Sequence, residues 1–338
     1  MPVSVALVGC GNRGLQLANV IRRTGKLSIA AVCDVDETRL EAAKAALGVP
    51  GERDHQRLLQ RSDVEAVVVA TSARFHAPVT LDALAAKKHV YVEKPLADSP
   101  SVARKLAAAA ESAGVVALVG YQRRFSPFSA ALAAEVPGIE PIQCTLVGQR
   151  GPMNIQFFFP DHYGGIVDTA THTLDEALWT MGGKPEGVMG HVRRGTILGD
   201  RTIEFMELII DFDGGTRSAT VVSSMIGHGA ANLHEYVGRL GNIWTTDGRT
   251  LHVSRHPAIT EGGAKPPAGL ERRDVAIGGG VDETGLALGN FADTITGTAE
   301  AGWPRGCSFA EGAYAIAASA AMVQSAEEGR RIRLDEVE

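Results

Sequence analysis

The chain has 338 residues, of which 45% are hydrophobic and 21% charged, and its formal net charge is −6 at pH 7. This length accommodates two domains with buried cores, and the acidic balance argues against nucleic-acid binding. No apolar run reaches the roughly 18 residues that a membrane-spanning helix needs, and four widely separated cysteines argue against a disulfide framework or a metal site and favour a reducing cytoplasm.

The N-terminus has no signal-peptide pattern and leads directly into an apolar run at residues 3–8, which predicts a buried strand. The pattern Gly9-x-Gly11-x-x-Gly14 follows at once and opens a helical pattern. Gly9 permits a tight turn, Gly11 lets the backbone approach a pyrophosphate, and Gly14 permits close packing of helix on strand. The helix N-terminus attracts phosphates. The stretch therefore predicts a dinucleotide-binding turn.

A second apolar run, at residues 29–33, ends in Asp34, which lies 20 residues after Gly14. A Rossmann unit places at this point the acid that binds a ribose 2′-hydroxyl, and a carboxylate there repels a 2′-phosphate. The sequence thus favours NAD over NADP. Arg39 leaves NADP open, because it either reaches a phosphate or lies on the exposed face of the helix that Asp36 caps.

Three further apolar runs, at residues 66–70, 89–92 and 115–119, alternate with helical patterns near residues 76–86 and 99–113. This alternation predicts a doubly wound parallel sheet, whose ligands lie beyond the carboxyl ends of the strands. The polar residues that follow these strand ends are candidates for the ligand rim, and they are Thr71, Ser72, Glu93, Lys94, Tyr121 and Arg123. The Lys94–Pro95 bond is a candidate for the cis form.

The second half begins with a strand at residues 141–147 and a helix that starts at Gly164-Gly165 and ends before Gly182-Gly183. Asp168 and His172 are four residues apart, so they lie on one face of this helix. By itself such a pair is more typical of a surface helix than of an active site. Asp175 lies further along the same face.

Strand-like runs follow at residues 187–192, 203–212, 217–225, 236–240 and 243–246. The turns Asp213-Gly214-Gly215 and Asp247-Gly248 join consecutive strands tightly, which predicts an antiparallel sheet. Arg150 is equally compatible with a substrate contact and with an ordinary edge arginine. The histidines of these strands form no defensible ligand constellation, and two helices, near residues 282–297 and 309–328, close the chain.

Together, Gly9-x-Gly11-x-x-Gly14, Glu93-Lys94-Pro95 and Gly164-Gly165-x-x-Asp168-x-x-x-His172 resemble the glucose–fructose oxidoreductase / inositol dehydrogenase (Gfo/Idh/MocA) family. The resemblance covers almost the whole chain and includes Thr71, His76 and the segment 121–125. One departure is that Thr71-Ser72-Ala73 stands where many members have Thr-Pro-Asn, near the nicotinamide side of the site.

The resemblance implies an α/β fold, with a Rossmann doubly wound parallel sheet at residues 1–121 and a C-terminal α/β domain with a large, mostly antiparallel sheet at residues 122–338. It also implies hydride transfer between NAD(P) and a hydroxyl-bearing carbon of a sugar, sugar derivative or cyclitol. Members usually associate through the C-terminal sheet, which implies a homodimer or homotetramer. By motif match the catalytic residues are Lys94, Asp168 and His172, and no metal is expected.

In this chemistry His172 is the best general base, Lys94 stabilises the developing alkoxide, and Asp168 orients the imidazole or contacts the substrate. The predicted cofactor-binding residues are Gly9, Gly11, Asn12, Arg13, Gly14, Asp34, Thr71, Ser72, His76, Glu93 and Lys94. The predicted substrate-binding residues are Lys94, Tyr121, Arg123, Arg150, Asp168 and His172.

Three alternatives use the same motifs. The first is a glycosidase that oxidises its sugar transiently with tightly held NAD, and the second is a transhydrogenase-like enzyme whose cofactor does not dissociate. The third is a non-enzymatic nucleotide-binding regulator, against which the intact set of Lys94, Asp168 and His172 counts, because a sensor needs no proton-transfer groups.

Overall fold

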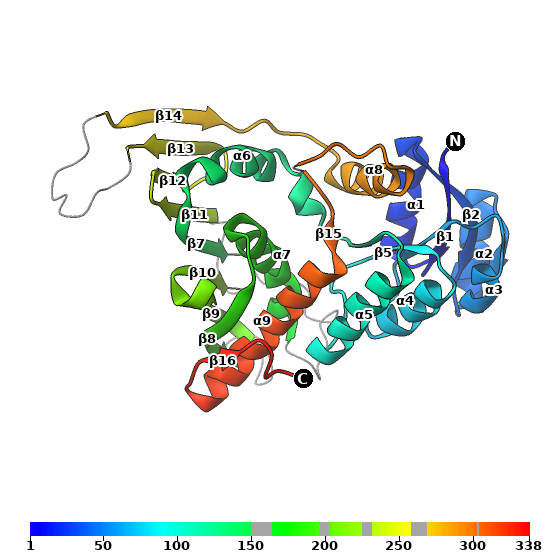
Figure 1. Ribbon diagram of the computed structural model, residues 1–338. Coiled ribbons are helices and arrows are strands. Elements are labelled where there is room, and N and C mark those ends of the chain that lie inside the picture. The colour runs from blue at the N-terminus through cyan, green and yellow to red at the C-terminus, as the bar shows by residue number, and fades with distance from the viewer. Residues whose placement is uncertain (150–163, 196–202, 225–231, 258–268, 303) are drawn as a thin grey trace. The chain divides into compact units, whose positions relative to one another are not determined.

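The computed structural model in Figure 1 describes residues 1–149, 164–195, 203–224, 232–257, 269–302 and 304–338. Its backbone contacts divide the chain into two compact units. The first comprises Met1–Phe125 and Asp282–Ile316, and the second comprises Ser126–Val281 and Ala317–Glu338. The first unit thus includes a segment from late in the chain, whereas the predicted boundary at residue 121 assigns that segment to the second domain.

The first unit contains a seven-stranded sheet of order β15-β6-β5-β4-β1-β2-β3. Every neighbouring pair is parallel except β15 with β6. This order, in which β1 lies between β4 and β2, confirms the predicted doubly wound sheet. The strands are β1 Val3–Val8, β2 Leu27–Cys33, β3 Gly51–Glu52, β4 Ala66–Val69, β5 His89–Val92, β6 Ala117–Val119 and β15 Cys307–Ser308.

The helices of this unit begin and end close to the predicted residues. They are α1 Asn12–Thr24, α2 Glu37–Leu47, α3 His55–Leu59, α4 His76–Ala85, α5 Pro100–Ala113 and α8 Glu283–Thr296, with short 3₁₀ turns at Ala73–Phe75 and Gln122–Phe125. Asp36 caps α2 by accepting a hydrogen bond from the backbone N–H of Arg39, and Ser99 caps α5 in the same way.

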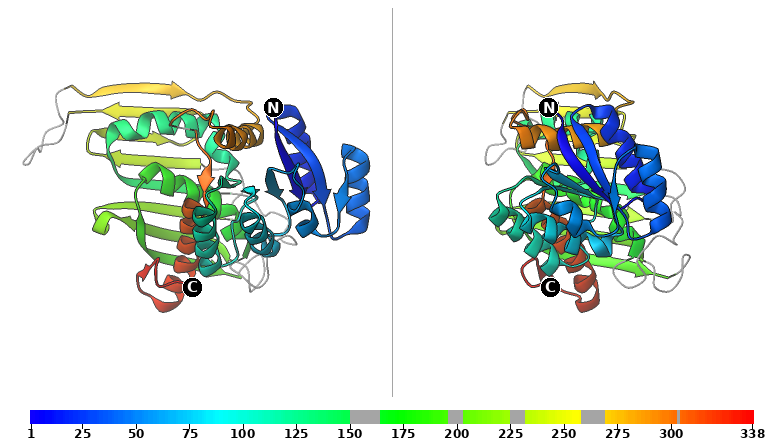
Figure 2. Two further views of the ribbon diagram at one scale, coloured as in Figure 1. Left: turned by 45° about the vertical axis from the view of Figure 1, so that its right-hand side comes forward. Right: turned by 90° about the vertical axis from the view of Figure 1, so that its right-hand side faces the viewer.

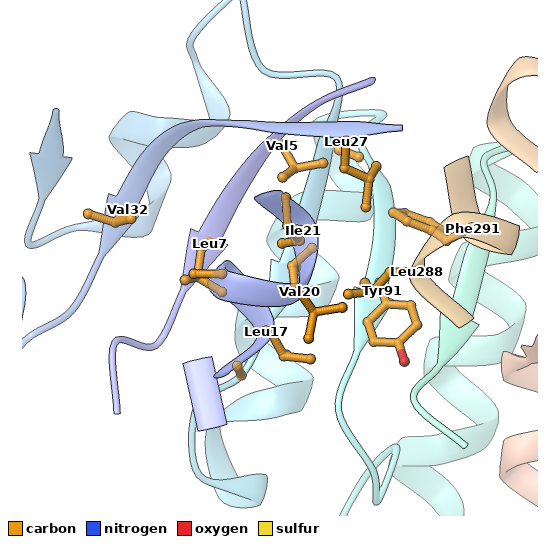
Figure 3. Packing of buried hydrophobic residues seen from close by; sticks show 14 of the residues in the cluster. Val5, Leu7, Leu17, Val20, Ile21, Leu27, Val32, Tyr91, Leu288 and Phe291 are labelled. Carbon is orange, nitrogen blue, oxygen red and sulfur yellow. The ribbon is translucent and has the colours of Figure 1, made fainter. Parts of the chain in front are cut away.

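The core of the first unit forms between β1, β2, α1 and α8, as Figure 3 shows. Leu7 and Leu17 are fully buried in it. Leu288 and Phe291 of α8 belong to the same cluster, although they lie far along the chain. The ring of Phe291 lies 5.7 Å from that of Tyr91 in β5. Burial of apolar surface therefore explains why the late segment folds with the first unit.

The second unit contains a nine-stranded sheet of order β14-β13-β12-β11-β7-β10-β9-β8-β16. Its neighbours are antiparallel except β7 with β10, which confirms the predicted, mostly antiparallel sheet. The strands are β7 Pro141–Gln149, β8 Pro185–Arg194, β9 Ile203–Phe212, β10 Arg217–Ser224, β11 Asn232–Gly238, β12 Gly241–Thr245, β13 Thr250–Arg255, β14 Glu271–Ala276 and β16 Ile332–Arg333.

Strands β13, β14 and the two-residue β16 are additions to the predicted set. The sequence of β14 is Glu-Arg-Arg-Asp-Val-Ala, and nearly all of it is exposed. It lies at one edge of the sheet, where β13 is its neighbour among the strands that the structure describes. An edge strand with polar side chains on both faces lacks the apolar alternation by which strands are recognised.

Helices α6 (Pro127–Glu135) and α7 (Gly164–Met181) lie over one face of this sheet, as the two views of Figure 2 show. Phe128 of α6 and Glu176 of α7 both contact His234 of β11 from that side. Helix α9 (Phe309–Glu328) is counted with the first unit up to Ile316 and with the second from Ala317. The helices thus cover one face of the sheet.

Candidate active site

The glycine turn after β1 has the stereochemistry that its motif predicts. Gly9 has φ +101°, and a Cβ there would lie 2.6 Å from the backbone of Ala70. A Cβ on Gly14 would lie 1.9 Å from the carbonyl oxygen of Gly9. Gly11 is different, because a Cβ there meets nothing within 4 Å. Gly9 and Gly14 are therefore required by the protein's own packing, and the space beside Gly11 is open.

Gly11 is also the N-cap residue of α1, and no side chain caps this helix. The first backbone N–H groups of α1 are thus left for another acceptor, and the positive end of the helix dipole favours a phosphate. Asn12 is exposed at the start of the helix. An open glycine beside an uncapped helix N-terminus fits the pyrophosphate of a dinucleotide.

This geometry separates the roles of two glycines. We expect Gly11→Ala to keep the stability of the wild type and to weaken NAD binding by about tenfold or more, because the new methyl group occupies only the space of the ligand. Gly14→Ala should instead unfold the first unit. Calorimetric NAD titration with thermal denaturation measures both effects, and an unchanged affinity in the Gly11 variant would contradict the proposed pyrophosphate site.

Asp34 follows β2 and its carboxylate is held in one orientation. Oδ2 accepts a hydrogen bond of 2.7 Å from the backbone N–H of Cys10, and Oδ1 accepts one of 2.9 Å from that of Asp36. Asp34 is 8% exposed. Arg39 lies on the exposed face of α2, with Nε 3.7 Å from Asp36. A fixed carboxylate at this point binds ribose hydroxyls and disfavours a 2′-phosphate.

The thiols beside Asp34 are inert. Burial raises the pKa of Cys10 to about 12, and the charge of Asp34 adds to the shift. Burial likewise raises the pKa of Cys33 to about 12, with Cys10 and Asp34 as further causes. Both thiols remain protonated at neutral pH, so neither is a nucleophile. All four cysteines of the chain are buried and free.

The Glu93-Lys94-Pro95 turn after β5 is tied to the glycine turn. Arg13, in the first turn of α1, donates a hydrogen bond of 2.8 Å from Nε to Oε1 of Glu93, and its Nη2 lies 2.7 Å from the same oxygen. Glu93 is buried, with 8% of its side chain exposed. Lys94 is half-buried, and its bond to Pro95 is cis. The structure thereby brings together three of the predicted residues.

His76 ties the turn after β4 to the same loop. It is 1% exposed at the start of α4. Its Nδ1 lies 2.7 Å from the carbonyl oxygen of Pro95, and its Nε2 lies 3.1 Å from that of Thr71. Thr71 itself is half-buried, and Ser72 is exposed. His76 therefore contacts the backbone carbonyl groups of two loops, and it holds together the loops that carry Thr71 and Lys94.

Tyr121 and Arg123 follow β6, as the sequence predicts. Tyr121 is 1% exposed, and Arg123 is half-buried in the 3₁₀ turn Gln122–Phe125. The strand ends of β1, β2, β4, β5 and β6 thus carry the predicted rim of the parallel sheet. The remaining predicted residues belong to the second unit.

In the second unit α7 carries the predicted acid–base residues. His172 is 9% exposed and Asp175 is 3% exposed. Asp168 lies in the backbone of α7, and its side chain is outside the described part of the chain. Arg150 is outside the described residues. The spacing of Asp168 and His172 alone favours a position on the protein surface. The structure instead buries His172.

The end of α7 is held by the sheet. The helix ends at Met181, and Gly182 follows with φ +62°, as the glycine pair predicts. Arg217, the first residue of β10, donates hydrogen bonds to the carbonyl oxygens of Met181 and Gly182. Asp213 pairs with the same guanidinium at 2.5 Å. A cation at the C-terminal end of a helix satisfies its last carbonyl groups and its dipole.

The middle of α7 carries a contact that the sequence analysis does not include. Oε1 of Glu176 lies 2.6 Å from Nδ1 of His234 and accepts a hydrogen bond of 3.2 Å from the hydroxyl of Tyr236. The available signal is the two-residue spacing of His234 and Tyr236, which places both on one face of a strand. Nothing in the sequence indicates which carboxylate they meet.

No group of three or more metal-ligating side chains occurs among the residues that the structure describes. In the same part of the chain, no helix is long and apolar enough to cross a membrane.

Comparison with known proteins agrees with this architecture. Residues 3–121 match the family described as the GFO_IDH_MocA oxidoreductase family with an NAD-binding Rossmann fold. The chain is 26% identical to myo-inositol 2-dehydrogenase of Thermotoga maritima over 345 residues, covering 98% of this chain and 99% of the relative. It is 27% identical over 268 residues to scyllo-inositol 2-dehydrogenase (NAD(+)) of Bacillus subtilis, covering 75% and 76%.

The fold has solved counterparts. A probable dehydrogenase from Thermotoga maritima aligns with a TM-score of 0.79 over 99% of this chain and all of that chain, at 23% identity. Its likeness supports the fold of both units. The glycine turn, Asp34 and the uncapped α1 also fit the cofactor of the matched family. Residues 3–121 therefore match the NAD-binding Rossmann fold of the Gfo/Idh/MocA oxidoreductase family in sequence and in geometry, and the chain resembles a relative named as an inositol dehydrogenase over nearly its whole length.

Proposed function

We propose that this NAD-binding oxidoreductase transfers a hydride between NAD and a hydroxyl-bearing carbon of a cyclitol or sugar, with inositols as the first candidates. The observation that carries the proposal is the buried His172 on α7, in a chain that aligns over 98% of its length with a myo-inositol 2-dehydrogenase. An imidazole is the usual general base for removing a hydroxyl proton near neutral pH.

The roles of the protein's own groups follow from their chemistry. NAD, when bound, supplies the hydride acceptor. Gly11 and the N-terminus of α1 bind its phosphates, and Asp34 binds the adenosine ribose. Lys94, as an ammonium group, lowers the pKa of the substrate hydroxyl and stabilises the alkoxide. His172 accepts the hydroxyl proton, and Asp168 orients the imidazole or contacts the substrate.

The supporting residues keep these groups in place. Glu93 binds Arg13, and His76 contacts the carbonyl oxygens of Thr71 and Pro95, so the loop of Lys94 is attached on two sides. Substrate contacts come in this proposal from Tyr121 and Arg123, with Arg150 and the α7 residues of the second domain. The relatives reported above carry dehydrogenase names and do not support the glycosidase or the regulator alternatives.

The experiment that tests the function follows NADH formation. The protein is incubated with NAD and, separately, with myo-inositol, scyllo-inositol and glucose, each also carrying deuterium on the carbinol carbons. Formation of NADH with transfer of deuterium to the nicotinamide is the expected result. If NAD binds in a parallel titration but none of these compounds reduces it, the proposed substrate class is wrong.

We also propose that the protein is a homodimer or homotetramer and that its subunits meet through the face of the nine-stranded sheet opposite α6 and α7. Met189, Ile209, Leu233 and Trp244 lie on this face and are 46%, 42%, 38% and 37% exposed. The strand register places Met189 beside Ile209. Met189 and Ile209 form a small apolar patch of the kind that marks protein–protein contacts, and strands β10 and β7 separate it from Leu233 and Trp244 on the same face. The proposed occupant is a second copy of the sheet.

A charged substitution in this patch should dissociate the assembly. Ile209→Lys places a cation among apolar side chains of the proposed interface, so we expect light scattering to give the mass of a monomer for this variant and a multiple of it for the wild type. Glu207→Lys, two residues away on the same face, is a matched control at a residue that is already charged. A monomeric wild type would contradict the proposal.

A further inference from the structure

Glu176 connects α7 to the centre of the nine-stranded sheet. One oxygen of its carboxylate, Oε1, is approached by two groups of β11, Nδ1 of His234 at 2.6 Å and the hydroxyl of Tyr236 at 3.2 Å. The side chains of Glu176 and His234 are 14% and 9% exposed, and Tyr236 is fully buried. Two groups that are two residues apart on one strand thus approach a single atom of the helix, the phenol as a hydrogen-bond donor and the imidazole as a close polar contact.

The surroundings leave this cluster little freedom to rearrange. The ring of Phe128, in α6, meets the ring of His234 edge to face, with centroids 4.7 Å apart and planes at 85°. Burial raises the pKa of Tyr236 well above its ordinary value, and the charge of Glu176 adds to the shift, so the phenol stays a hydrogen-bond donor. The imidazole is held between a helix on one side and the carboxylate on the other.

A buried polar cluster contributes little net free energy to the stability of a helix, because its groups lose their contacts with water. Removing a carboxylate from water costs free energy that apolar side chains of similar size do not lose, so such pairs contribute less to stability than to a defined geometry. The Arg217 cap holds α7 only at its C-terminal end, at Met181 and Gly182. A polar contact in the middle of the helix adds to the packing of its buried apolar side chains in resisting rotation about the helix axis.

Rotation matters here because of where Glu176 lies. It follows His172 by four residues and Asp168 by eight, so the three lie on one stripe of α7. Side-chain atoms lie about 6 Å from a helix axis, and a rotation of about 10° therefore displaces them by about 1 Å. A displacement of this size at a reacting group can slow a reaction by up to about 10²-fold.

We propose that Glu176 and His234, assisted by Tyr236, are positioning residues that set the rotation of α7 and thereby the orientation of His172. They touch neither substrate nor cofactor in this proposal and act through the helix alone. The inference rests on the proposed function, since it takes His172 to be the general base.

The test compares Glu176→Gln, His234→Asn and the double variant with the wild type, using NAD and myo-inositol as the assay pair. We expect each single substitution to lower kcat about tenfold and to change both KM values less than twofold, because neither residue touches the cofactor or the inositol and the small rotation of α7 affects the alignment of the reacting groups most. Since both residues act through one contact, the double variant should also lose about tenfold rather than about a hundredfold.

His55→Asn is the matched control, because Nε2 of His55 lies 2.8 Å from a carboxylate oxygen of Asp82 and both residues belong to the first unit, whereas α7 belongs to the second. It should leave kcat unchanged. A cluster that only stabilises the fold would lower the melting temperature and leave kcat, measured well below it, within twofold of the wild type, and that result overturns the proposal. Multiplicative losses in the double variant would overturn it as well.

Two further measurements keep the inference testable. If the polar variants fail to fold, Tyr236→Phe removes one hydrogen bond without changing the shape of the cluster, and it should lower kcat about threefold at unchanged KM values. If the wild type does not oxidise myo-inositol, the proposed substrate class fails first. Amide hydrogen exchange then tests whether the contact holds α7. In the His234→Asn variant the amides of α7 should exchange faster than in the wild type, and those of α1 should exchange at the same rate.

Discussion

Replacing His172 with alanine should lower kcat by about 10²–10⁴-fold, the usual contribution of a positioned general acid–base group. The hydroxyl proton then loses its proposed acceptor, whereas NAD binding should persist, because Gly11 and Asp34 follow strands of the parallel sheet in the first unit. The affinity for NAD should therefore equal that of the wild type. Initial rates with NAD and myo-inositol, together with an NAD titration, measure the two quantities.

The control for this experiment must separate a lost base from a damaged helix. His172 is 9% exposed, so its truncation also removes buried contacts. His172→Gln fills most of the same volume without providing a base, and it should lose as much activity as the alanine variant while melting closer to the wild type. Activity within tenfold of the wild type in both variants would show that His172 is not the base.

Replacing Glu311 with glutamine should destabilise the first unit by about 3 kcal/mol, the cost of removing the charged partner from a buried ion pair. Arg124 is 1% exposed, and its Nη1 lies 3.3 Å from Oε1 of Glu311. Arg305 donates two further hydrogen bonds of 2.8 Å to the same carboxylate, and the backbone N–H of Ser308 donates another. Urea denaturation at pH 7, followed by circular dichroism, measures the change.

The pH dependence of the stability is a second test of the network of Glu311 with Arg124 and Arg305. Burial alone would raise the pKa of Glu311, but the charges of Arg124 and Arg305 and the N–H of Ser308 outweigh it and lower this pKa from 4.5 to about 2. A depressed carboxyl pKa stabilises the fold above the unfolded-state value and loses this contribution as pH falls. The wild type should therefore lose stability between pH 4.5 and about 2, and Glu311→Gln should lose less.

A matched surface pair is the control for both readings. Arg194 and Glu327 lie 3.7 Å apart, with 38% and 66% of their side chains exposed. Exposed pairs contribute at most about 1 kcal/mol, so Glu327→Gln should change the stability by less than about 0.5 kcal/mol. Equal losses in the two glutamine variants would mean that the Arg124 network is no stronger than an ordinary surface contact.

Much of the first unit was predictable because its signals are local. The run at residues 3–8, the glycine turn and Asp34 each specify a strand, a turn or a strand end by their own stereochemistry. Alternating strands and helices then leave few ways to build the sheet. The return of Asp282–Ile316 to this unit was not predictable, because it depends on Leu288 and Phe291 filling a core whose other members lie far away in sequence.

In the second unit the hairpin strands β9 and β10 were predictable from alternation and from the turn at Asp213-Gly214-Gly215. The edge strand β14 was not, because its exposed side chains carry no periodic apolar signal. Helix α7 was predictable in extent, since glycines bound it on both sides. Its anchoring by Arg217 was not, because a single arginine after a turn has no sequence signature of a helix cap.

By itself the sequence determined the dinucleotide turn, the carboxylate that favours NAD and the helix that carries His172, because each depends on residues close together along the chain. Only the tertiary structure decided which distant groups hold those parts in place. Glu176 meets Tyr236 from 60 residues away, and Arg13 meets Glu93 from 80. Such contacts depend on which strands neighbour one another and which side chains face inward, and these are properties of the packed sheet rather than of any segment of it.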